Sequence, residues 1–307
     1  MVKVIHLMCL ILIRNFNCEL IGGSLSNVII EFIEDFYINQ QKAAVVNIIF
    51  VASHDLWFKD IWRHFGNDIT FQLEDFNDVT PAATIRSNNI LIMDYLLQIK
   101  DFHKLLSPAA FNFQGYFLII LTQEVATNSA IKTMMEMLWK KFILNVNVLV
   151  RMDYNNTEAW IVLTYFPFNK DSCGQINPVI LNTFQSGKFQ IQNTTFYPRK
   201  DIHLHNCTLK VGVFHAPPYM FLKTKMIDNR NVSDGIDGMD GQLLMTMAKY
   251  VNFTYELVIV PENIRWGETY RNGSATGAFK LVTYFVFYSI FIKVQQFFSL
   301  IDSYQRC

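Results

Sequence analysis

The chain has 307 residues, enough for two domains of ordinary size or for one large one. Its 26 Lys and Arg residues balance 26 Asp and Glu residues, and this zero formal charge argues against nucleic acid as a partner. Hydrophobic residues make up 51% of the chain, but they are not gathered into long membrane-spanning runs, so the composition is that of a globular protein.

The amino terminus has the layout of a secretory signal. Lys3 precedes an apolar run over residues 4–13, and small residues follow that run. We therefore predict a cleaved signal peptide over residues 1–24. Because Arg14 comes directly after the run, an uncleaved anchor and a buried core helix remain alternatives.

Glycosylation acceptors point to the same compartment. Asn-x-Ser/Thr occurs six times, always in the second half of the chain, at Asn155, Asn193, Asn206, Asn231, Asn252 and Asn272. Any one of these can arise by chance in a chain rich in Asn, but their clustering favours the lumen of the secretory pathway. We expect the mature protein on the extracellular side of the plasma membrane.

The cysteines give a weaker indication. Apart from Cys9 and Cys18 in or beside the signal, Cys173, Cys207 and Cys307 remain, so Cys173 and Cys207 are the candidate disulfide pair and Cys307 would be unpaired.

Residues 25–168 alternate between helix-length and strand-length segments. Helices are expected over 26–40, 55–65, a segment ending at 106, and 127–142; strands are expected over 43–52, 69–73, 90–95, 116–122, 146–152 and 160–168. The strands lack polar alternation, as required in a parallel sheet that is covered on both faces. The sequence predicts a doubly wound α/β amino-terminal domain with a parallel sheet over residues 25–168.

Folds of this kind bind ligands at the carboxyl ends of their strands, where a cofactor or catalytic fingerprint should appear. The sequence has no G-x-G-x-x-G after a strand, no G-x-x-x-x-G-K-[ST], no G-x-S-x-G and no H-E-x-x-H. We therefore expect neither a cofactor nor an enzyme, because function has to be argued from a site.

Residues 169–207 turn polar and are predicted to be a linker, and a second α/β pattern begins at residue 208. It comprises a strand over 209–214, a turn at Pro217-Pro218, a loop over 223–237, a helix over 240–251, a strand over 255–260 and a loop over 266–277. The acidic run 234–241 lacks the ligand spacing of a calcium loop and is interpreted as a glycine-rich turn feeding the helix, with Asp240 near the helix start favoured by the dipole.

Three potential zinc ligands stand near the start of this pattern. His203, His205 and Cys207 alternate, so a strand would point all three the same way. A structural zinc site needs four ligands, no obvious fourth ligand follows, and a disulfide-bonded Cys207 cannot be a thiolate ligand. We expect no metal.

Five pieces in a fixed order then resemble the first ligand-binding segment of ionotropic glutamate receptors, and the insect ionotropic receptor family in particular. They are Leu209-Lys-Val-Gly-Val-Phe-His-Ala-Pro-Pro-Tyr219, Gly238-Met-Asp-Gly-Gln-Leu-Leu-Met-Thr-Met-Ala248, Asn252-Phe-Thr-Tyr-Glu-Leu257, Trp266-Gly267 and Asn272-Gly-Ser-Ala-Thr-Gly277-Ala. The resemblance implies that residues 208–281 form part of a periplasmic-binding-protein-like lobe, one half of a clamshell that closes on a small ligand.

The same resemblance implies roles for individual residues. Trp266 would be the aromatic wall over the ligand, and Tyr219 and Pro218 would shape the edge of the cleft. Ala216 stands where glutamate-gated members carry an acidic residue and Ala275 where they carry Trp, so the implied agonist is an odorant or tastant rather than glutamate. The implied assembly is a tetrameric cation channel with co-receptor subunits.

The family pattern is lost after Leu281, and residues 282–307 form an atypical hydrophobic tail. The tail has about a dozen apolar residues before Lys293, whereas a membrane span needs ~20. We interpret the tail as translated intron sequence or a truncated gene model, with the channel segments missing from this chain. The alternative function is a secreted, non-channel ligand-binding protein or decoy.

Overall fold

The computed structural model describes residues 25–50, 55–65, 68–75, 79, 85–93, 106–122, 128–154, 157–170, 172–200, 203–227, 230–261, 263–268, 270 and 274–284. Two compact units divide the chain: the first takes residues up to 166 together with 176–199, and the second takes 167–175 together with the residues from 200 onward. The predicted signal peptide, all but the first residues of the predicted tail, and the acceptors Asn155 and Asn272 fall outside the described residues.

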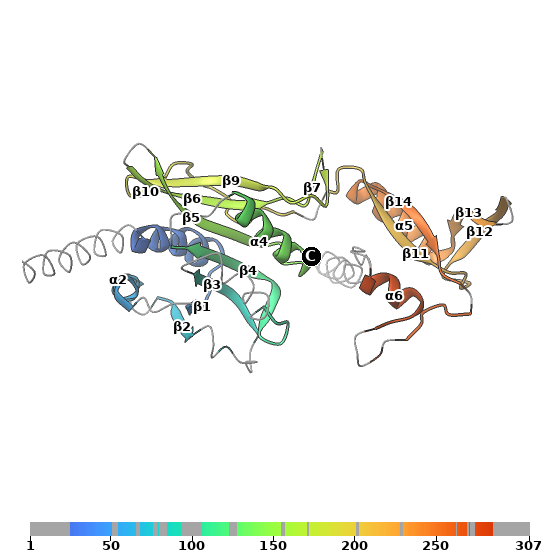
Figure 1. The fold of residues 1–307 in the computed structure, drawn as a ribbon, viewed down its shortest axis with the longest axis horizontal. Helices are drawn as coiled ribbons and strands as arrows, with labels where there is room; N and C mark the ends of the chain where they lie inside the picture. Colours follow the sequence, from blue (N-terminus) through green and yellow to red (C-terminus); the bar gives the residue numbers. More distant parts are fainter. Residues whose placement is uncertain are drawn as a thin grey trace, which may run out of the picture. The chain divides into compact units, whose positions relative to one another are not determined.

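The first unit is built on an eight-stranded sheet with the order β10-β9-β6-β5-β4-β3-β1-β2 (Figure 1). The strands are β1 (Val45–Phe50), β2 (Thr70–Asp75), β3 (Arg86–Met93), β4 (Phe111–Leu121), β5 (Val146–Tyr154), β6 (Thr157–Tyr165), β9 (Pro178–Gln185) and β10 (Lys188–Phe189). Strands β2, β1, β3, β4 and β5 run parallel to one another, whereas the pairs β5 with β6, β6 with β9 and β9 with β10 are antiparallel.

Side chains are buried on both faces of this sheet. Along β4, Leu118 and Ile120 belong to the core cluster beneath the first helix, and the intervening Phe117, Ile119 and Leu121 are buried equally well. The helices of the unit are residues 25–32 continuing into the π-helix η1 (Ile33–Gln40), α2 (Asp55–Phe65) and α4 (Asn128–Lys140). The α/β class with a large, mostly parallel sheet, read from the unbroken apolar strands, is thereby confirmed.

Strand β6 departs from the expected parallel arrangement. Only two residues separate the end of β5 at Tyr154 from the start of β6 at Thr157. A parallel connection needs a crossover of a dozen or more residues, so this short link forces an antiparallel pair. The apolar composition of β6 gave no hint of its direction, because burial on both faces looks the same in either orientation.

The predicted linker 169–207 is largely structured instead. Strands β9 and β10 extend the sheet, and the segment after them, residues 190–199, returns over its face; we call it the returning segment. Its Phe196 and Tyr197 lie in the core against Phe32 and Phe36, with ring centroids 4.5 Å apart for Phe32 and Phe196 and 4.3 Å apart for Phe36 and Tyr197. The polar composition of residues 169–207 predicted a linker and gave no indication that these two aromatic residues are buried.

Two buried asparagines of the sheet hold the returning segment. Asn147 in β5 donates from Nδ2 to the carbonyl oxygen of Phe196 at 2.8 Å, and Asn182 in β9 donates to Thr194 Oγ1 at 2.6 Å. Both asparagines are fully buried, so these bonds give their Nδ2 donors partners that would otherwise be costly to do without away from water. Burial also raises the pKa of the Tyr197 phenol well above its usual value.

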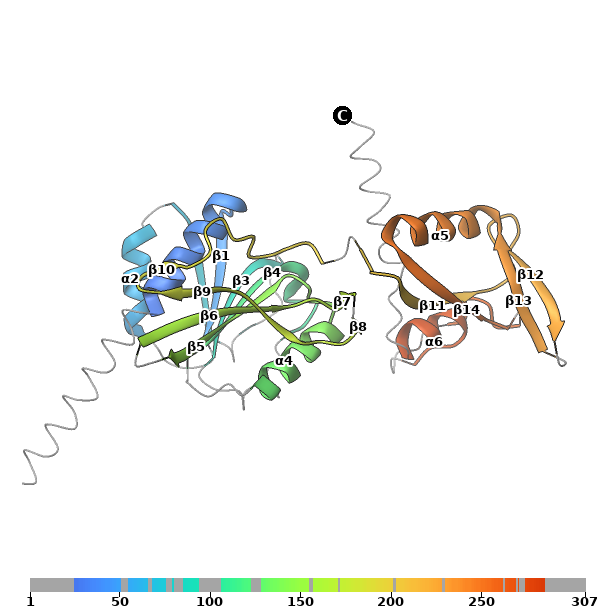
Figure 2. The same ribbon diagram turned by 90° about the horizontal axis from the view of Figure 1, so that it is seen from above.

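The second unit contains β7 (Phe168–Asn169), β8 (Ser172–Cys173), β11 (Cys207–Val213), β12 (Phe221–Ile227), β13 (Arg230–Asp237), α5 (Gly238–Val251), β14 (Phe253–Ile259) and α6 (Gly277–Tyr284). Strands β11 and β14 are parallel, and Figure 2 shows α5 and α6 on opposite sides of them. Strands β12 and β13 form an antiparallel hairpin where a loop over 223–237 was expected. Cys173 and Cys207 are joined by a disulfide.

Within the described ranges, no helix is both long and apolar enough to cross a membrane.

Candidate ligand-binding site

The carboxyl ends of β11 and β14 lie at the same edge of the second unit, because the two strands are parallel and in register from Cys207 and Phe253 to Val213 and Ile259. The Val260 amide donates to the Val213 carbonyl oxygen at 2.8 Å and carries the pairing one residue further. In open α/β sheets this edge is where ligands bind. The chain leaves the edge at Phe214 on one strand and at Pro261 on the other.

Trp266 lies at this edge within a small aromatic cluster. Its ring is 4.9 Å from that of Phe214 at an interplanar angle of 80°, and 6.3 Å from that of Phe279 on α6. These separations are typical of favourable aromatic contacts. Trp266 remains 50% exposed, so the indole is held by its neighbours and still presents a large surface to solvent. We call Phe214, Trp266 and Phe279 the Trp266 cluster.

Two glycines fix the backbone around the Trp266 cluster. Gly267 has φ +75° and Gly277 has φ +59°, and the two backbones touch so closely that a Cβ on Gly267 would lie 1.9 Å from the Thr276 carbonyl oxygen. The crossing is tied by a hydrogen bond from the Ala278 amide to the Arg265 carbonyl oxygen at 2.8 Å. Glycine is required at such a point because no other residue allows both the conformation and the approach.

Pro218 and Tyr219 lie in a separate feature, the turn between β11 and β12. The Pro217-Pro218 peptide is cis, and the Asp240 amide at the start of α5 donates to the Tyr219 carbonyl oxygen at 2.8 Å. A Cβ on Gly238 would lie 2.6 Å from the same oxygen, so glycine at position 238 lets the helix approach the turn. The Tyr219 side chain is 55% exposed.

The start of α5 is capped by Asp237, one residue before the glycine. Asp237 Oδ1 accepts from the Gly238 amide at 2.8 Å and from Gln242 Nε2 at 3.0 Å. The hydrogen bond from Gln242, followed by that from the Gly238 amide, holds the pKa of the Asp237 carboxyl below its usual range. The glycine-rich run therefore starts a helix, as interpreted from the sequence, but the capping side chain is Asp237.

The structure thus places the three predicted ligand residues in two features. Trp266 belongs to the aromatic cluster at the strand edge, while Pro218 and Tyr219 contact the start of α5 through their carbonyl oxygens. Sequence reasoning did not single out Phe214 or Phe279 as partners of the indole. Phe214 could have been found, because it is the last residue of a predicted strand whose partner strand ends close to Trp266 in the chain.

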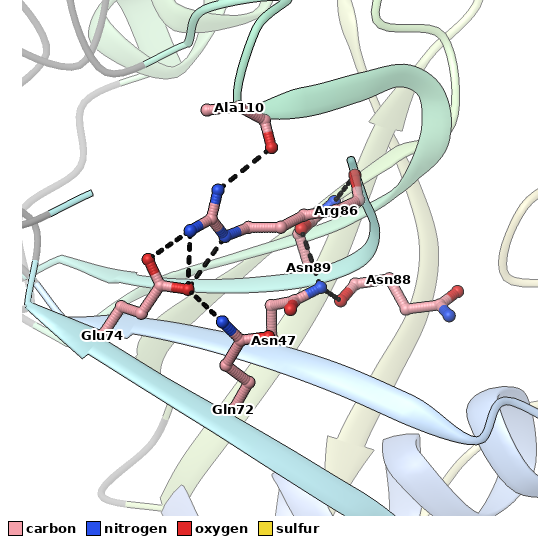
Figure 3. A network of polar contacts seen from close by, with 7 residues as sticks. All are labelled: Asn47, Gln72, Glu74, Arg86, Asn88, Asn89 and Ala110. Carbon is pink, nitrogen blue, oxygen red and sulfur yellow. Dashed lines mark hydrogen bonds and ion pairs between the residues drawn. The ribbon is translucent and has the colours of Figure 1, made fainter. Parts of the chain in front are cut away.

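A second polar arrangement lies in the first unit and is drawn in Figure 3. The Arg86 guanidinium donates to both carboxylate oxygens of Glu74, from Nε to Oε1 at 2.9 Å and from Nη2 to Oε2 at 2.5 Å. Its Nη1 donates to the Ala110 carbonyl oxygen at 3.1 Å. The Arg86 and Glu74 side chains are only 3% and 14% exposed, so this arginine grips a carboxylate of its own chain. The pair is structural.

Among the residues that the structure describes, no group of three or more His, Cys, Asp or Glu side chains could hold a metal ion. The rings of His203 and His205 lie 4.6 Å apart at an interplanar angle of 60°, but Cys207 is oxidised to the disulfide and cannot be a thiolate ligand.

Comparison with known proteins identifies the family. A family profile described as "Putative ionotropic receptor, ligand binding domain" matches residues 19–203, more than half of the chain. The chain therefore belongs to the ionotropic receptor family. It is also 30% identical over 107 residues to Ionotropic receptor 21a of Anopheles gambiae, a match that spans 34% of this chain and 11% of the mosquito protein.

The matched residues 19–203 correspond closely to the first unit, which ends at residue 199. Trp266, Tyr219 and Pro218 lie beyond them. The family assignment and the proposed ligand site consequently rest on different parts of the chain, and an experiment has to connect them.

Proposed function

We propose that the chain is the extracellular, ligand-binding portion of a chemosensory ligand-gated cation channel. The first unit is a doubly wound domain, and residues 208–281 of the second unit form part of a periplasmic-binding-protein-like lobe. The ligand is a small odorant or tastant, and the working receptor is a tetramer with co-receptor subunits whose pore is supplied by segments beyond these 307 residues. The proposed role is recognition, with no catalysis.

One observation supports this proposal above the others: a half-exposed indole stands at the carboxyl edge of two parallel strands, on a backbone crossing that only glycines allow. A flat aromatic face that is fixed from behind and open in front suits the wall of a small-molecule site. Because the Phe214 and Phe279 rings support it, the indole does not have to be ordered when a ligand arrives, which lowers the cost of binding.

The test is Trp266→Ala in the receptor encoded by the complete transcript, expressed with co-receptor subunits and challenged with a panel of small volatile and water-soluble compounds. Loss of a central aromatic contact costs about 2 kcal/mol or more, so the half-effective agonist concentration should rise by at least about tenfold. Currents or calcium signals measure it.

Trp62→Ala is the matched control, since Trp62 is 52% exposed, lies in the first unit and contacts a phenylalanine, Phe71, at 6.4 Å. It should leave the agonist response unchanged. Equal shifts for the two variants, or none for Trp266→Ala, would remove the site from the second unit.

A second candidate follows from the family description, which attaches ligand binding to residues 19–203. In that case the ligand contacts the first unit and the Trp266 cluster has another role. An unchanged response in Trp266→Ala, together with ligand protection of first-unit amides from hydrogen exchange, would favour this candidate.

Membrane fractionation of the native product distinguishes the proposed channel subunit from the alternative, a secreted decoy. The native product of a channel gene stays with membranes through salt and alkaline washes, whereas a decoy is released into the medium as a ligand-binding monomer.

A further inference from the structure

Two glycosylation acceptors lie side by side at the amino-terminal edge of β11 and β14, the edge opposite the Trp266 cluster. Asn206-Cys207-Thr208 enters β11 and Asn252-Phe253-Thr254 enters β14, with Cys207 paired to Phe253 and Thr208 to Thr254. Both asparagines have left-handed backbones, with φ +65° and +56°. The Asn206 amide donates to the Asn252 carbonyl oxygen at 2.7 Å.

In the folded unit the two acceptors share a side-chain hydrogen bond. The hydroxyl groups of Thr208 and Thr254, which an acceptor needs two residues after its Asn, hydrogen-bond to each other at 2.8 Å. Asn252 also ends α5, and its Nδ2 lies 3.3 Å from His203 Nε2. Both threonines are exposed, but the pairing of β11 and β14 engages their hydroxyl groups with each other, so a glycan is attached most readily before the two strands pair.

The first acceptor carries an additional constraint, because its middle residue is the disulfide cysteine. Cys207 is 1% exposed and bonded to Cys173, which lies 34 residues earlier in the chain. Both cysteines are therefore synthesised before β14, so the disulfide can close while the acceptor still lacks its partner strand. Once closed, it ties Cys207, the residue between Asn206 and Thr208, to Cys173 in β8, and the three-residue acceptor can no longer extend freely.

We propose that Asn206 is an N-glycosylation site whose occupancy is set by competition with the Cys173–Cys207 disulfide. In one step, Asn206 Nδ2 forms a bond to the anomeric carbon of a lipid-pyrophosphate-linked oligosaccharide, the bond from that carbon to pyrophosphate breaks, and the amide loses a proton. In the other, the two thiols lose two protons and pass two electrons to a disulfide of a lumenal oxidoreductase, which leaves as a dithiol. Closing the disulfide first leaves Asn206 unmodified.

This inference rests on the proposed extracellular location. The acceptor Asn193 serves as the internal reference, because it lies in the exposed part of the returning segment in the first unit. Asn193 lies in the loop that the disulfide closes, but its own acceptor, residues 193–195, contains no cysteine, so it serves to report entry into the secretory pathway.

The experiment is site-by-site glycopeptide mass spectrometry on the full chain made in an insect secretory cell line. Wild type should show partial occupancy at Asn206, and Cys173→Ser should raise it about twofold or more without changing Asn193. A brief exposure of wild-type cells to a membrane-permeant reductant during synthesis should raise Asn206 in the same way, without a substitution that could impair folding. Thr208→Val should abolish glycosylation at Asn206, because it removes the hydroxyl group that the acceptor needs, and it therefore sets the zero level of the occupancy measurement.

Equal Asn206 occupancy in wild type and Cys173→Ser, or a rise of the same size at Asn193, would overturn the competition while leaving the location intact. Absence of glycan at Asn193 together with Asn206 would overturn both the competition and the extracellular location.

Discussion

Replacing Gly267 with alanine should unfold most of the second unit. A methyl group at this position would lie 1.9 Å from the Thr276 carbonyl oxygen, and the φ of +75° is disfavoured for any residue with a Cβ. The conformational cost of about 1–2 kcal/mol adds to a similar or larger overlap cost, giving about 3–5 kcal/mol in total. Hydrogen exchange of the α5 amides, followed by mass spectrometry, should accelerate accordingly.

Gly174→Ala supplies a closely matched control in the same unit. Gly174 has φ +78°, within a few degrees of Gly267, but a Cβ there would meet nothing within 4 Å. It should therefore show only the conformational cost of about 1–2 kcal/mol. If both variants exchange equally fast, the close crossing of Gly267 and Gly277 is not what holds Trp266 in place.

Breaking the pair of Arg86 and Glu74 should destabilise the first unit by a comparable amount. Glu74→Met removes the carboxylate that accepts from Arg86 Nε and Nη2, and leaves a guanidinium whose side chain is 3% exposed. Removing one partner of a buried ion pair costs about 3–5 kcal/mol, because the remaining charge stays desolvated. Urea unfolding, monitored by the fluorescence of the buried Trp160, measures it.

The double variant Arg86→Met with Glu74→Met should recover most of this loss, because it removes both charges from the interior. As a surface comparison, Asp60→Asn breaks a pair with Arg63 in which the Arg63 and Asp60 side chains are 77% and 52% exposed, and should cost less than about 1 kcal/mol. A double variant as unstable as Glu74→Met would show that the two side chains act by volume rather than by charge.

Local patterns were sufficient for much of the fold. The helix over 55–65 has the predicted bounds, and the apolar runs that became β1, β4 and β5 were recognised because each is buried on both faces. The direction of each strand and its pairing partners were harder to predict from the sequence. The antiparallel β6 depends on the length of one connection, and β9 is buried only at Asn182 and Phe184 and has no long apolar run.

The candidate site could be predicted from the sequence only in part, because it also depends on contacts between separate segments. Trp266, Gly267 and Gly277 were found in motifs, but the sequence did not indicate that the two glycines touch, and Phe214 lies far from Trp266 in the chain with no periodicity connecting them. Arg86 and Glu74 are 12 residues apart, and no sequence pattern indicated that they pair. Contacts of this kind are set by how the chain crosses itself, which single-sequence patterns do not encode.

The returning segment has a practical consequence for dissecting the protein. Since Phe196 and Tyr197 complete the interior around Phe32 and Phe36, a piece cut at residue 168, where the apolar strands stop, would expose those rings and be prone to aggregate. A self-sufficient first unit has to be carried through to about residue 199. The boundary of an expressed fragment is therefore set by the burial of Phe196 and Tyr197, about thirty residues beyond residue 168, where composition alone would place it.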